Sequence, residues 1–113
     1  MNLTDKVVWI TGASAGIGEA TAQLAAKKGA KLVLSARRLE ELERVKRSLN
    51  LPDNDVLVVP MDVEKPDDFP ALVENVIRHF GRIDVLYNNA GISLRGGVVD
   101  TVLAVYNRLM EVY

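Results

Sequence analysis

The sequence predicts an α/β fold in which a parallel sheet carries helices on both faces. Short, almost wholly apolar runs alternate with longer segments whose apolar residues recur at helical spacing. The connections between them are short, which favours parallel strands joined by helical crossovers. We therefore expect a doubly wound sheet with strand order 3-2-1-4. Residues 1–113 are expected to form a single domain.

Four short runs are the expected strands. They are residues 7–10, 31–34, 56–59 and 83–87. The first three are too short and too uniformly apolar to be surface helices. They are therefore predicted to be strands buried on both faces of the sheet.

Helical spacing fills the gaps between these runs. The first predicted apolar face consists of Ile17, Ala20, Thr21, Leu24 and Ala25, with Gly29 as the stop signal. The second consists of Leu39, Leu42, Val45 and Leu49, and residues 51–55 then have turn chemistry. The third and clearest consists of Phe69, Leu72, Val73, Val76, Ile77 and Phe80, with Gly81 at the capping position. A further helix is expected over residues 100–113.

The composition argues against several functions. The formal net charge of -1 gives no electrostatic basis for binding nucleic acid or an acidic membrane. There is no cysteine, and no His, Asp and Glu cluster has metal-ligand spacing, so we expect neither disulfides nor a metal site. No apolar run reaches membrane-spanning length and no targeting segment is visible, which favours a cytoplasmic protein.

A glycine-rich segment directly follows the first expected strand. It contains Gly12, Ser14, Gly16, Ile17 and Gly18. At a strand-to-helix junction, glycines permit a tight turn and bring backbone N–H groups and the positive helix end close to a phosphate. The serine adds a hydroxyl donor. A glycine turn without a ligand is the alternative, and the flanking strand and helix argue against it.

Two arginines, Arg37 and Arg38, follow the second strand. In a dinucleotide-binding sheet this position meets the adenosine ribose, and a carboxylate there favours NAD(H). Here the carboxylate is absent, and guanidinium groups can bind a 2′-phosphate with paired hydrogen bonds. We therefore predict NADP(H) as the cofactor. The alternative is a pair of solvated charges at a helix start, where the helix dipole makes arginine mildly unfavourable.

Polar and small residues also follow the third and fourth strands. Asp62 and Val63 follow the third, and Asn89, Ala90 and Gly91 end the fourth. Such sheets bind ligands at the carboxyl ends of their strands. Taken alone, Asp62 could simply cap the next helix, and the Asn-Asn-Ala-Gly segment could be an ordinary loop.

Together these segments resemble the amino-terminal half of a short-chain dehydrogenase/reductase with a Rossmann-type fold, over residues 6–113. The resemblance implies that Gly12, Ser14, Gly16, Ile17 and Gly18 line the cofactor diphosphate. It implies that Arg37 and Arg38 hold the 2′-phosphate of NADP(H). It also implies that Asp62 and Val63 flank the adenine, and that Asn89, Ala90 and Gly91 lie beside the ribose. The family is NADP-preferring where such arginines stand.

The resemblance further implies a catalytic Ser, a Tyr, and a Lys four residues after that Tyr, all beyond the Asn-Asn-Ala-Gly segment. This chain ends 22 residues after Gly91, and its last lysine is Lys65. Neither Tyr87 nor Tyr106 has a lysine four residues later. We expect no catalytic residue here and no turnover by this chain alone. Its parent would transfer hydride between NADPH and a carbonyl or alcohol.

Several functions stay open beside the truncated oxidoreductase. The chain could be a minimal nucleotide-binding domain that holds NADP(H) without turnover. It could be an interaction fragment that forms a homo-oligomer, or pairs with a relative, through its last helix and the edge of its fourth strand. A methyltransferase-like domain also has a glycine-rich loop, but it would usually need an acidic residue after the second strand.

Overall fold

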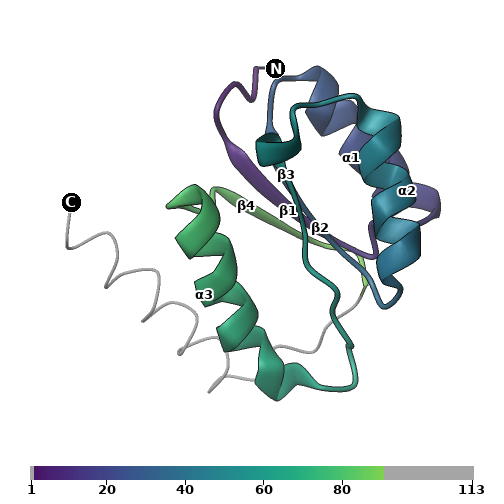
Figure 1. The fold of residues 1–113 in the computed structure, drawn as a ribbon, viewed down its shortest axis with the longest axis vertical. Helices are drawn as coiled ribbons and strands as arrows, with labels where there is room; N and C mark the ends of the chain where they lie inside the picture. Colours follow the sequence, from purple (N-terminus) through teal and green to yellow (C-terminus); the bar gives the residue numbers. More distant parts are fainter. Residues whose placement is uncertain (1, 91–113) are drawn as a thin grey trace.

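The sheet has the predicted strand order. The computed structural model describes residues 2–90. Its parallel strands lie in the order β3-β2-β1-β4, with β2 and β1 in the interior (Figure 1). The strands are β1 (Val7–Thr11), β2 (Lys31–Ser35), β3 (Val56–Val58) and β4 (Val85–Asn88). The prediction of a doubly wound parallel sheet is confirmed.

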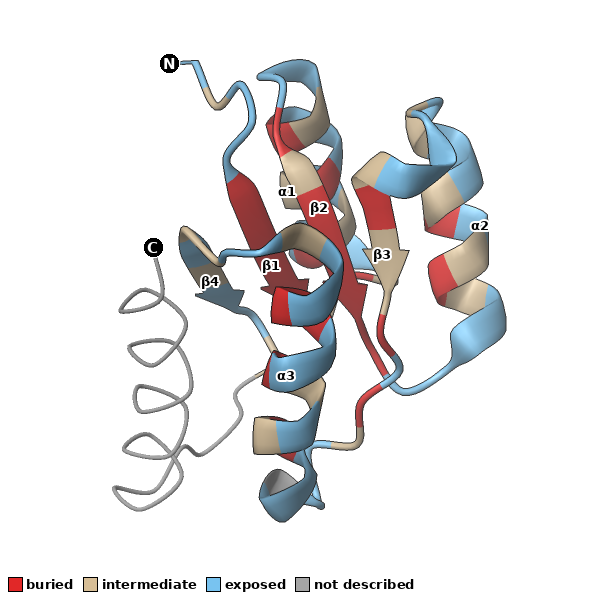
Figure 2. Cartoon of the chain, turned by 60° about the vertical axis from the view of Figure 1, so that its left-hand side comes forward, coloured by how far each residue is buried: buried red, intermediate tan, exposed pale blue. Residues whose placement is uncertain are grey.

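Helices cover both faces of this sheet. Helices α1 (Gly16–Lys27) and α2 (Leu39–Leu49) pack on one face, and α3 (Phe69–Phe80) packs on the other (Figure 1). Two short 3-10 turns, η1 (Asp53–Asp55) and η2 (Pro66–Asp68), precede β3 and α3. Alternate residues of β1 serve the two cores: Val8 and Ile10 lie with α1 and α2, whereas Val7 and Trp9 lie with α3. The strand is buried along its whole length (Figure 2), which explains why it is apolar from Val7 to Ile10.

Helix α3 follows the sequence prediction closely. Phe69, Val73, Val76 and Ile77 are buried. The Phe69 ring stacks on Trp9 of β1, with centroids 5.1 Å apart. The helix ends at Gly81, whose φ of 81° is the left-handed conformation that glycine adopts without strain.

Helix α1 buries a different face from the predicted one. Its buried residues are Gly18, Ala22 and Ala25, whereas Ile17 is 69% exposed and Leu24 is 58% exposed. Small side chains let the helix axis come close to the strands, which a face bearing isoleucine and leucine would prevent. The prediction that Ile17, Ala20 and Leu24 lie in the core is therefore wrong, although Ala25 is placed correctly.

Strand β4 begins at Val85, two residues later than expected, and is an edge strand within the described part of the chain. Its register pairs Val85 with Val8 and Tyr87 with Ile10. Both β4 side chains are exposed, although their β1 partners lie in the core. The predicted helix over residues 100–113 lies outside the described residues.

Candidate functional site

The predicted site residues come from loops at one end of the sheet. Each of these loops follows the carboxyl end of a strand. The chain moves from β1 outward to β2 and β3, then crosses back to place β4 on the other side of β1. The carboxyl ends of β1 and β4 therefore flank the point where the direction of winding reverses. Ligands bind to doubly wound sheets in this crevice.

A pocket of about 240 Å³ lies at this end of the sheet. Five predicted residues line it together, one or more from each of the four strand ends: Gly12, Arg37, Asp62, Val63 and Ala90. Three further lining residues were not predicted: Ala36, Met61 and Glu64. Ala36 and Met61 were missed because small and apolar residues after a strand carry no chemical signal in the sequence.

The glycines of the first loop differ in backbone conformation and in the space around them. Gly12 and Gly16 have φ angles of 66° and 55°, in the left-handed region. Gly18 lies within α1, and a Cβ atom there would be 2.0 Å from the Gly12 carbonyl oxygen. A Cβ atom on Gly16 would meet nothing within 4 Å. Gly18 is therefore required for packing, whereas Gly16 borders open space.

The start of α1 leaves backbone donors available for an anion. Its N-cap residue, Ala15, has an extended backbone and no side chain caps the first turn. Uncapped N–H groups and the positive end of the helix dipole favour a bound phosphate. Ser14 contributes its carbonyl oxygen to a contact with Arg44 of α2 at 2.9 Å. The arrangement is chemically suited to a diphosphate.

Hydrogen bonds tie the end of β1 to the end of β4. The Ala90 N–H donates to Thr11 Oγ1 at 3.0 Å, and Thr11 Oγ1 donates to Asn88 Oδ1 at 3.1 Å. Asn89 Nδ2 donates to the Gly12 carbonyl oxygen at 3.3 Å. Thr11 is fully buried. Thr11 thus joins the ends of β1 and β4. In the sequence, the signal for this role is a threonine directly after an apolar run. The remaining predicted residue of this segment, Gly91, lies outside the described residues.

The two arginines after β2 are placed differently. Arg37 lines the pocket, whereas Arg38 is the N-cap residue of α2 and is exposed beside it. No carboxylate stands at the end of β2, where Ser35 and Ala36 are buried. The pocket therefore presents a guanidinium group at this strand end.

Asp62 has a local structural role as well as a place in the pocket. Its Oδ1 accepts a hydrogen bond from the Glu64 N–H at 2.9 Å. This bond forms a turn two residues long rather than a cap on α3. Val63 is 45% exposed although it is apolar, and it lines the same pocket. An exposed valine beside a strand end offers a flat apolar surface to a ligand ring.

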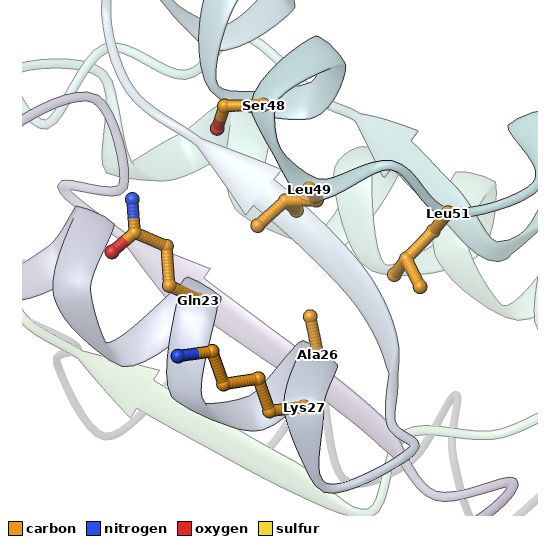
Figure 3. A pocket seen from close by; sticks show the side chains of 6 residues that line it. All are labelled: Gln23, Ala26, Lys27, Ser48, Leu49 and Leu51. Atoms are coloured by element: carbon orange, nitrogen blue, oxygen red, sulfur yellow. The ribbon is translucent and has the colours of Figure 1, made fainter.

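A second hollow lies away from these strand ends, between α1 and the end of α2 (Figure 3). Its volume is about 270 Å³, and none of the predicted site residues lines it. Among residues 2–90, no group of His, Asp and Glu side chains has the geometry of a metal site. In that same part of the chain, no helix is long and apolar enough to cross a membrane.

Comparison with known proteins points to one family. The family model described as short chain dehydrogenase matches residues 6–113. The human protein named dehydrogenase/reductase SDR family member 7 is 51% identical over 113 residues. That match covers 96% of this chain and 33% of the human protein. The chain thus spans about one third of the length of this relative.

Solved structures of longer proteins share the fold. Glucose dehydrogenase of Caenorhabditis elegans, in its apo form, has a TM-score of 0.76 and 30% identity. That match covers 94% of this chain and 50% of the nematode protein. The C-domain of a bacterial malonyl-CoA reductase, solved with NADP, has a TM-score of 0.69 and 33% identity. That match covers 81% of this chain and 16% of the reductase chain.

Proposed function

We propose that this chain, which belongs to the short-chain dehydrogenase family, supplies the NADP(H)-binding half of an oxidoreductase. Arg37, in a pocket with Gly12 and Asp62 and with no carboxylate at the end of β2, is the observation that carries this proposal. A 2′-phosphate would be attracted to a guanidinium group at this position and repelled by a carboxylate. Arg38, exposed at the start of α2, would add a second positive charge.

The other strand ends fit the rest of the cofactor. The diphosphate would lie at the glycine loop, where Gly16 borders open space and the first turn of α1 has no side-chain cap. The adenine would lie between Asp62, which can accept from its amino group, and the exposed Val63. Asn89 and Ala90 would then lie beside the ribose. The binding of NADP by the malonyl-CoA reductase C-domain, a structural neighbour, agrees with this assignment.

The parent reaction would be hydride transfer between NADPH and a carbonyl or alcohol, with the nicotinamide supplying or accepting the hydride. The residues described here would bind and orient the cofactor. The 113-residue sequence has no tyrosine with a lysine four residues later. We therefore propose that this chain by itself binds the cofactor without turning over a substrate.

The experiment is calorimetric titration of the 113-residue chain with NADPH and with NADH. We expect NADPH to bind about tenfold or more tightly, because charge-assisted hydrogen bonds to the 2′-phosphate form only with NADPH. In the double variant Arg37→Asp with Arg38→Ala, this preference should disappear. Arg78→Asp, an exposed substitution on α3, is the matched control. A preference that survives in the double variant would contradict the assignment.

Association between chains is a second candidate function. Val85 and Tyr87 extend the apolar face of β1 but are 43% and 38% exposed, and they lie on an edge strand of the described sheet. Such an edge favours pairing with another chain. Size exclusion of wild type and Tyr87→Lys would test this. A larger species that the substitution dissociates supports association, and a monomer at all concentrations argues against it.

A further inference from the structure

One arginine outside the predicted site connects the glycine loop to two helices. Arg44 lies in the middle of α2 and its side chain is half exposed. Its Nη2 donates to the Ser14 carbonyl oxygen at 2.9 Å and to Glu19 Oε1 at 3.1 Å. Its Nε donates to Glu41 Oε2 at 2.9 Å. A single guanidinium group therefore joins the loop, the first turn of α1 and the first turn of α2.

The contact with Arg44 holds one carbonyl group of the glycine loop. Ser14 lies between Gly12 and Gly16, two residues whose backbone is in the left-handed region that glycine adopts without strain. Among the hydrogen bonds described for Ser14, the one from Arg44 to its carbonyl oxygen is the contact that joins it to α2. The bond to Arg44 fixes the direction of the Ser14 carbonyl group toward α2.

The charges around Arg44 matter to a phosphate bound at the same place. Glu19 lies in the first turn of α1, and its side chain is 23% exposed. An unpaired carboxylate there would repel an anion at the helix start. The hydrogen bonds to Glu19 and then to Glu41 raise the pKa of Arg44 above its ordinary value. An arginine is charged at neutral pH in any case, and its ion pairs compensate both carboxylates.

We propose that Arg44 is a positioning residue of the cofactor site. It holds the Ser14 carbonyl group toward α2 and compensates the charge of Glu19, so that the glycine loop can accept a diphosphate. This inference rests on the proposed function, because it assigns a residue to the same NADP(H) site. Arg44 itself need not touch the cofactor.

The test is NADPH titration of matched variants. We expect Arg44→Met to raise the Kd for NADPH about three- to tenfold, and Arg47→Met, an exposed substitution on the same helix, to leave it unchanged. Adding Glu19→Gln to Arg44→Met should recover part of the affinity, because it removes the uncompensated carboxylate. Arg44→Lys should also recover part of it, since lysine keeps the charge. Equal affinity of the Arg44→Met and Arg47→Met variants would overturn the proposal.

A measurement without ligand separates this inference from the proposed function. Hydrogen exchange of the amides of residues 13–19 should be faster in Arg44→Met than in Arg47→Met, because the loop has lost its contact with α2. If the wild-type chain binds no NADPH, the proposed function fails, and with it the cofactor role of Arg44. If wild type binds and only the loop exchange is unchanged, the loop-holding role is wrong while NADP(H) binding stands.

Discussion

Individual glycines in the first loop have separable roles. Gly18 packs against the Gly12 carbonyl oxygen so closely that a Cβ atom would lie 2.0 Å from it. Gly16 has space around it but a positive φ of 55°. The sequence shows three glycines of equal standing. Only the backbone conformation distinguishes the one needed for packing from the one that borders the expected ligand.

The first prediction concerns these two glycines. Gly18→Ala should lower the free energy of unfolding by about 3 kcal/mol, since the opposing atom is backbone and cannot move freely. Gly16→Ala should cost only about 1 kcal/mol through backbone strain, yet weaken NADPH binding. Urea unfolding followed by the fluorescence of Trp9, the only tryptophan, measures stability.

Gly81→Ala is the matched control for Gly16→Ala. Gly81 also has a positive φ, of 81°, and an added Cβ atom there would meet nothing within 4 Å. It lies at the end of α3, just before β4 begins, and therefore away from the carboxyl ends of the strands. It should show the same loss of stability with NADPH affinity unchanged. Equal effects of the two variants on NADPH affinity would contradict the role given to Gly16.

The second prediction concerns Asp84, which joins the entry of β4 to the start of β1. Its Oδ2 accepts from the Val7 N–H at 2.8 Å, and its Oδ1 pairs with Arg82 Nη2 at 2.6 Å. Burial opposes ionisation, but the hydrogen bonds from Arg82 and Val7 outweigh it and lower the pKa of Asp84. Asp84→Ala should lower the free energy of unfolding at pH 7 by about 1–2 kcal/mol. Asp67→Ala, at an exposed position, should change it little.

The pH dependence of this effect has a defined sign. Because the pKa of Asp84 is lowered on folding, its stabilisation is complete above the ordinary Asp value of about 3.9. It is lost as the pH falls through the lowered value. The difference in unfolding free energy between wild type and Asp84→Ala should therefore be constant from about pH 7 to 5 and shrink towards pH 3. A difference that grows on acidification would contradict this role.

At the scale of elements, helical periodicity predicted the positions of the helices well. It predicted less well which face of each helix is buried. In α3 the apolar stripe and the buried face coincide, because large residues face the sheet across from Trp9. In α1 the larger apolar residues of the predicted face, Ile17 and Leu24, are exposed, and small residues are buried instead. The close approach of the helix at Gly18 favours this face of small residues, and spacing alone does not reveal that approach.

The third prediction follows from this reversed face. Leu24→Ala should change the free energy of unfolding by less than about 0.5 kcal/mol, because the leucine is 58% exposed. Ala22→Leu should cost about 1–3 kcal/mol, because Ala22 is fully buried and a larger side chain would push the helix from the strands. Urea unfolding of both variants checks this. If Leu24→Ala cost more unfolding free energy than Ala22→Leu, the buried face would instead be the one that periodicity predicts.

At the scale of the whole molecule, the sequence predicted the strand order, and the rules of parallel sheets indicated the end of the sheet where the predicted site residues lie together. Both follow from alternation and from the rules of parallel sheets, so local residues suffice. It did not predict the contact of Arg44 with Ser14, which joins residues 30 positions apart and depends on how two helices lie together. Charged residues on a helix surface give no sequence signal for such a partner.

The most direct test of the central claim uses only the part of the cofactor that the described pocket would hold. Adenosine 2′,5′-bisphosphate and adenosine 5′-monophosphate differ in the 2′-phosphate alone, and each would be titrated calorimetrically into the 113-residue chain and into its Arg37→Asp variant. We predict that the bisphosphate binds wild type about tenfold or more tightly than the monophosphate, and that Arg37→Asp abolishes the difference. Equal binding of the two ligands by wild type, or binding of neither, would contradict the claim that the pocket at the carboxyl ends of the strands binds NADP(H).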